Sequence, residues 1–137
     1  MVFVELCPYA SPRYRLQLLL PQLRDDVGFQ ISADVLSLLL DRAQPALVLV
    51  NGGDAVGAFV ERAGPRLVWE ERHYESSSSS RTKRLHHWQG WYSSGTYRIP
   101  VGGFPFLRTP GSHNSNAELG QLGQQLHQLV VGDPDAR

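Results

Sequence analysis

Turn-forming residues divide the middle of this 137-residue chain into short segments. Four clusters rich in Gly, Pro, Asn or Ser interrupt it, at residues 51–54, 63–65, 76–80 and 93–95. Such clusters favour tight turns, because Gly adopts positive φ angles and Pro and Asn fit turn positions. Strands are predicted on either side of these turns, at residues 46–50, 56–61, 66–75, 81–92 and 96–101. We therefore expect a β-meander of antiparallel strands.

Leucines at helical spacing precede these strands and predict two helices. The first begins at Ser11–Pro12, because Ser can cap free amides and Pro fits the first helical position. Its apolar face is formed by Leu16, Leu19, Leu20 and Leu23. Pro21 predicts a kink in this helix, and Gly28 predicts its end. Ser32 is the predicted N-cap of the second helix, which carries five apolar residues between Val35 and Leu40.

The two ends of the chain complete the expected fold. Ser115 or the residue before it caps a third helix, whose leucines recur at i, i+3, i+7 and i+10 from Leu119 to Leu129. A short apolar strand is predicted at residues 2–6. We expect a single α+β domain over residues 1–132 and a frayed tail at residues 133–137. Its antiparallel sheet would have about five strands, with three helices packed on one face.

The composition excludes several classes of protein. Lys and Arg together number 13, and so do Asp and Glu, so the formal net charge is zero. This balance excludes a globally basic nucleic-acid binder and an acidic disordered chain. No apolar run approaches the roughly 18 residues of a membrane span, and residues 1–5 lack the basic start of a secretory signal. We expect a cytoplasmic protein without membrane contact, in which the lone Cys7 forms no intrachain disulfide.

Charge is unevenly distributed along the chain. Residues 1–75 hold ten acids and seven arginines, and residues 118–137 have a net charge of −2. Between them, residues 76–117 hold five cations and no carboxylate. This acid-free segment also carries two of the three tryptophans. Guanidinium groups pair with anions, and aromatic rings stack on flat partners or form binding hot spots, so the segment is typical of a binding surface.

The candidate binding residues are cations and rings in this segment: Arg81, Lys83, Arg84, His86, His87, Trp88, Trp91, Tyr92, Tyr97 and Arg98. We expect a small non-enzymatic protein-binding domain of an accessory or regulatory type, such as an adaptor or inhibitor, that docks an acidic protein surface. The alternative is a nucleic-acid-binding module that uses the same residues on phosphates and bases. A third hypothesis is a small-ligand carrier or enzyme whose pocket contains His86 or His87. The oligomeric state stays open.

The same residues also have a purely structural interpretation. The tryptophans and Tyr92 would fill the core, and the arginines would pair with acids of the preceding strand. A hairpin centred on Ser78 would place Glu75 opposite Arg81, and cross-strand pairs of opposite charge contribute about 0.2–1 kcal/mol. Such pairing would cancel much of the basic character of the segment.

No motif identifies catalytic or metal chemistry. His86 and His87 are adjacent, so on a strand they point to opposite faces and do not share one ion. The chain lacks a zinc-binding Cys pattern, the G-x-S-x-G nucleophile motif and the Walker lysine. We therefore assign no catalytic residue, no metal and no cofactor.

Overall fold

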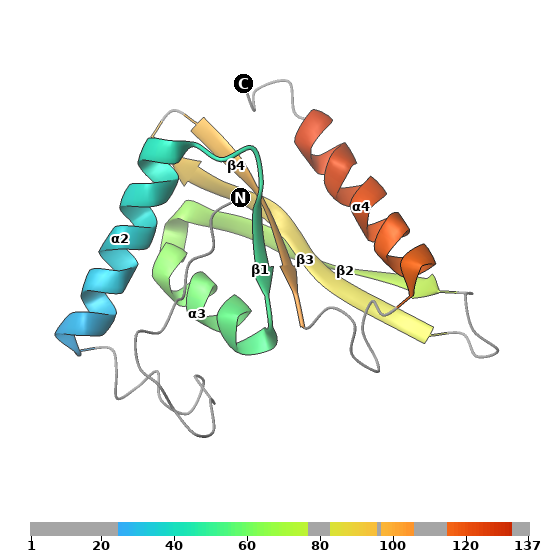
Figure 1. Cartoon of the computed structure of the whole chain (residues 1–137), viewed down its shortest axis with the longest axis horizontal. Helices are drawn as coiled ribbons and strands as arrows, with labels where there is room; N and C mark the ends of the chain where they lie inside the picture. Colours follow the sequence, from blue (N-terminus) through green and yellow to red (C-terminus); the bar gives the residue numbers. More distant parts are fainter. Residues whose placement is uncertain (1–24, 77–82, 96, 106–114, 133–137) are drawn as a thin grey trace.

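A four-stranded sheet organises the computed structural model, which describes residues 25–76, 83–95, 97–105 and 115–132 (Figure 1). Its strands are β1 (Val48–Asn51), β2 (Leu67–Ser76), β3 (Lys83–Ser94) and β4 (Tyr97–Phe104), in the order β1-β4-β3-β2. β2, β3 and β4 form an antiparallel meander, whereas β1 runs parallel to β4. The α+β class is confirmed. The prediction of about five antiparallel strands is wrong in detail, because the described residues form four strands in a mixed sheet.

Helix α3 (Gly53–Ala63) lies where the sequence predicts a hairpin turn and a strand at residues 56–61. Three of its buried residues recur at i, i+3 and i+7: Val56, Phe59 and Ala63. That spacing is typical of one face of a helix. The short apolar run at residues 56–61, which predicted a strand, therefore belongs to a helix. Gly52, with a φ of 112°, is the N-cap, so the glycines lead the chain from β1 into a helix.

Helix α2 (Val27–Ala43) begins earlier than the predicted N-cap Ser32. The N-cap is Asp26, whose side chain accepts a hydrogen bond of 2.9 Å from the amide of Phe29. Asp satisfies the free amides of a helix start as well as Ser does. Ser32 lies inside the helix, where its hydroxyl donates to the carbonyl oxygen of Phe29 at 2.9 Å. Gly28 lies in the first turn of α2, so it does not end an earlier helix, and both predictions are wrong.

Helices cover both faces of the sheet, not one face as expected (Figure 1). α2 and α3 lie on one face, around the buried Tyr92. α4 (Asn116–Val131) lies on the other face, where Leu126 clusters with the buried Phe104. Gly102 permits this contact, because a Cβ at that position would lie 2.8 Å from Cδ2 of Leu126. Alternate residues of β3 and β4 therefore face different helices.

Helix α4 begins where the sequence predicts. Ser115 is its N-cap, and Glu118 completes a capping box, in which each side chain accepts a hydrogen bond from the other residue's amide, at 3.2 and 3.0 Å. No helix in the described part of the chain is long and apolar enough to cross a membrane. The predicted strand at residues 2–6, most of the first predicted helix and the tail at residues 133–137 lie outside the described residues.

Candidate binding surface

β2 and β3 form a long hairpin whose far end extends away from α2 and α3 (Figure 1). The sequence predicts Glu75 opposite Arg81, but the register places Glu75 opposite Arg84. The strands therefore pair about a point between residues 79 and 80, whereas the prediction centres the hairpin on Ser78. This register decides which side chains of the two strands meet.

Four rings form a row along one face of this hairpin, and we call them the ring row: Trp69, Trp88, His86 and His73. Trp69 and Trp88 stack, with ring centroids 6.1 Å apart and planes inclined by 29°. His86 meets Trp88 edge-on at 5.2 Å and lies 5.9 Å from His73, its cross-strand neighbour. Trp69 lies 6.4 Å from Phe59 of α3, so the ring row leads from the core outward. Aromatic contacts at these separations are favourable.

Two glycines make room for the innermost ring of the row. A Cβ on Gly103 of β4 would lie 2.9 Å from Cζ3 of Trp69. A Cβ on Gly90, which pairs with Trp69, would lie 2.2 Å from the carbonyl oxygen of Val68. Neither position has space for a side chain, so the indole of Trp69 occupies the space that these glycines leave.

The outer part of the ring row is accessible and has charges of both signs beside it. The side chains of His73 and Glu71 are 38% and 44% exposed, and Nε2 of His73 lies 3.5 Å from Oε1 of Glu71. Further along the hairpin, Glu75 lies opposite Arg84 in the strand register, and both residues are exposed. Acidic residues of β2 therefore share this face with Arg84 of β3, so the face is not uniformly basic.

His87 and Trp91 lie on the opposite face of β3. His87 is fully buried, stacks on Phe104 at 6.2 Å, and places its Nε2 3.3 Å from Oε1 of Gln89. Burial lowers the pKa of His87, because it deprives the charged imidazolium of water. Trp91 is half-buried, and the guanidinium of Arg98 lies 5.0 Å from the centre of its ring.

Tyr92 belongs to the core. It is 2% exposed, and the guanidinium of Arg66 lies 4.5 Å from the centre of its ring. Arg66 and Ser94 both donate hydrogen bonds to Asp41 of α2, and the bond from Ser94 measures 2.7 Å. These hydrogen bonds lower the pKa of Asp41, and the bond from Ser94 has the larger effect. These bonds join the end of α2 to the end of β3.

Three of the ten predicted binding residues come together at the ring row: His86, Trp88 and Arg84. Arg81 lies outside the described residues, and Lys83 begins β3 at the same end of the hairpin. The remaining five lie in the core, on the opposite face or, in the case of Tyr97, at the start of β4, where it is 45% exposed.

Trp69 and His73 also belong to the ring row, but they are not among the binding residues predicted from the sequence. Residues 69, 71 and 73 alternate along β2, so the sequence does place them on one face of a strand. Which residues of β3 they meet depends on the hairpin register, which the alternation does not determine. Alternation alone therefore cannot assemble the ring row.

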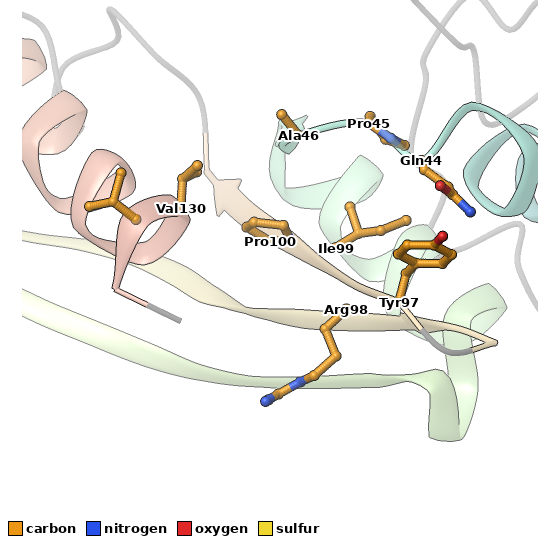
Figure 2. A pocket seen from close by; sticks show the side chains of 9 residues that line it. Gln44, Pro45, Ala46, Tyr97, Arg98, Ile99, Pro100 and Val130 are labelled. Carbon is orange, nitrogen blue, oxygen red and sulfur yellow. The ribbon is translucent and has the colours of Figure 1, made fainter. Parts of the chain in front are cut away.

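An open pocket of about 250 Å³ lies at the other end of the sheet (Figure 2). It is lined by residues 44–46, 97–100, 130 and 131, from the α2–β1 connection, β4 and the end of α4. Neither His86 nor His87 lines it, and the guanidinium of Arg98 extends to the side of β4 away from Tyr97. Small-ligand sites are mostly enclosed cavities with a few polar groups, whereas this pocket is open to solvent.

Among the described residues, no group of three or more His, Cys, Asp or Glu side chains is placed to hold a metal ion. Comparisons of the chain with protein-family models, with curated proteins and with solved structures found no match. What the chain does therefore has to be inferred from its own residues.

Proposed function

We propose that this chain is a non-enzymatic protein-binding domain of an accessory or regulatory type, which docks a protein partner on the ring row beside Arg84. The observation that carries this proposal is the line of rings that runs from the core to the accessible part of the hairpin. Tryptophan and arginine are enriched in protein–protein hot spots, because they combine large contact area with directed polar groups.

The ring row is ordered before any partner binds. Trp69 contacts Phe59 in the core, Trp88 stacks on Trp69, and His86 meets Trp88 edge-on. Side chains that packing already fixes lose little conformational freedom on association, so more of the contact energy contributes to affinity. A hairpin face with such rings therefore suits a docking site.

The charges beside the ring row favour a protein over a nucleic acid. Glu71 and Glu75 lie on the same face of the hairpin as Arg84, and their carboxylates would repel a phosphate backbone. A protein surface that carries both signs of charge can complement all three groups. Nucleic-acid binding stays the alternative, because a cation beside stacked rings also suits a single strand.

Affinity capture with the full-length protein tests this proposal. The baits are wild type, His86→Ala, Arg84→Glu and the control Val68→Ala, whose side chain is 67% exposed on the opposite face. Partners captured from a lysate of the source cells are identified by mass spectrometry, purified and titrated against each variant. We expect His86→Ala and Arg84→Glu to weaken binding about tenfold, equivalent to about 1.4 kcal/mol. Val68→Ala should leave the affinity unchanged.

Two outcomes contradict the proposal. Equal binding of the partner by all four proteins places the docking site elsewhere on the molecule. Binding of a fluorescent single-stranded oligonucleotide that weakens steeply with salt, and that Arg84→Glu abolishes, assigns the surface to nucleic acid. Thermal unfolding followed by circular dichroism checks that each variant is folded, so that lost binding reflects a lost contact.

A further inference from the structure

Helix α2 carries an apolar stripe on the side turned away from the core, and we call it the α2 stripe. Its members and their exposed fractions are Val27 (67%), Ile31 (56%), Val35 (46%) and Leu38 (56%). They are spaced i, i+4, i+8 and i+11, so they share one face of the helix. The buried residues of α2, such as Leu36 and Leu40, lie on the opposite side. A helix that is apolar on two opposite faces is typical of a helix covered on both.

The chain itself supplies a segment that matches the α2 stripe. Residues 1–24 precede the described part of the chain, and their leucines at positions 16, 19, 20 and 23 recur at helical spacing. In a helix, the leucines from Leu16 to Leu23 would span about 11 Å, and the α2 stripe spans about 17 Å, at 1.5 Å per residue. The leucines can therefore cover the part of the α2 stripe that lies nearest the connection.

The connection between these segments has the right length for an antiparallel helical hairpin. Only Arg24, Asp25 and Asp26 separate Leu23 from the start of α2. Antiparallel neighbouring helices are commonly joined by two to five residues. In such a hairpin, Leu23 lies near Val27 at the start of the α2 stripe, and Leu16 lies near Val35.

Charge and covalent linkage both favour this occupant. Asp34, which is exposed, flanks the α2 stripe, and residues 12–23 contain Arg13 and Arg15 but no carboxylate. A segment joined by a short linker is present at an effective concentration in the millimolar range. A second copy of the chain at micromolar concentration competes poorly with a segment that is held so close.

We propose that the α2 stripe is the docking site of residues 16–23 of the same chain, which complete an antiparallel helical hairpin with α2. The three-residue connection and the leucines at helical spacing directly before it carry this inference. It is independent of the ring row, which lies on the β2–β3 hairpin.

Cysteine cross-linking in the full-length chain tests the inference. In a Cys7→Ser background, Leu20→Cys is combined with Ile31→Cys or with Val35→Cys, because the hairpin register leaves either position in reach. The matched control combines Leu20→Cys with Leu49→Cys, which is 56% exposed on β1. We expect an intramolecular disulfide to form at least tenfold faster in one of the two α2 pairs than in the control, because a disulfide needs Cα atoms about 4.4–6.8 Å apart.

Each other outcome overturns the proposal. Oxidation in both α2 pairs that is no faster than in the control shows that residues 16–23 do not lie on α2. A disulfide-linked dimer that forms with Ile31→Cys alone, together with a dimer mass in light scattering, assigns the stripe to a second copy. A urea titration provides the second readout, in which Leu20→Ser and Ile31→Ser should each lower the unfolding midpoint. Their combination should lower it by less than the sum of the two shifts.

Discussion

Two histidines adjacent in the sequence have opposite environments in this fold. His86 lies in the ring row, half-buried, with its edge against Trp88 and its cross-strand neighbour His73 beside it. His87 lies on the other face of the same strand, fully buried and stacked on Phe104. One residue along a strand therefore separates an accessible ring from a core ring.

The positions of the helices, not the sequence of the strand, decide which face of β3 is accessible to a partner. α4 packs on the face of His87, where Leu126 clusters with Phe104. On the face of His86, the contact with α3 is made at Trp69, through Phe59, and the hairpin extends further. The two faces have similar ring content, so only the placement of helices distinguishes a candidate docking surface from a core.

Replacing Gly90 should disrupt the pairing of β2 with β3, on which both faces of the hairpin depend, and it has the largest expected effect. In Gly90→Val, the new Cβ would lie 2.2 Å from the carbonyl oxygen of Val68 and 2.4 Å from Cα of Trp69. Both are backbone atoms that cannot move aside without shifting β2. We expect a loss of stability on the order of 3 kcal/mol, measured by urea denaturation.

Gly57→Ala is the matched control for that variant. Gly57 lies inside α3, and a Cβ there meets nothing within 4 Å. Ala is the better helix former, so this variant should gain about 0.5–1 kcal/mol. If Gly90→Val were as stable as wild type, the close pairing of β2 with β3 at Trp69 would be wrong.

The burial of His87 should also make the stability depend on pH, with a smaller effect than that of Gly90→Val. Burial lowers the pKa of His87 below its usual value of 6.5, so the unfolded chain takes up a proton at a higher pH than the folded chain does. Stability should therefore fall as the pH drops below about 6.5. Asp41 also has a lowered pKa, but its effect begins only below its usual value of 3.8.

The measurement is the urea midpoint of wild type and His87→Phe at pH 7.5 and pH 5.5. Phe keeps a ring beside Phe104 and does not titrate, so the variant should lose much less of its midpoint at pH 5.5. His86→Phe, on the other face of the same strand, is the control for the change of ring. An equal fall in wild type and His87→Phe would show that His87 does not control this acid sensitivity.

The sequence predicts much of the hairpin but not the environment of its two faces. The turn clusters correctly delimit three consecutive strands, and Ser115 correctly marks the start of α4. The strand predicted at residues 56–61 is wrong, because a short apolar run of that length also fits a helix such as α3. The ring row depends on the register of β2 against β3, which pattern alone does not give.

The smallest expected effect is the most informative about function. His86→Ala removes a half-buried ring that makes one edge-on contact with Trp88, so its cost should be about 0.5 kcal/mol. His87→Ala empties a fully buried site beside Phe104 and should cost about 2 kcal/mol or more. Urea denaturation of both variants at pH 7.5 measures this difference. Equal losses of stability would mean that His86 stabilises the fold as much as His87 does. That result would contradict the assignment of the ring row as a docking surface.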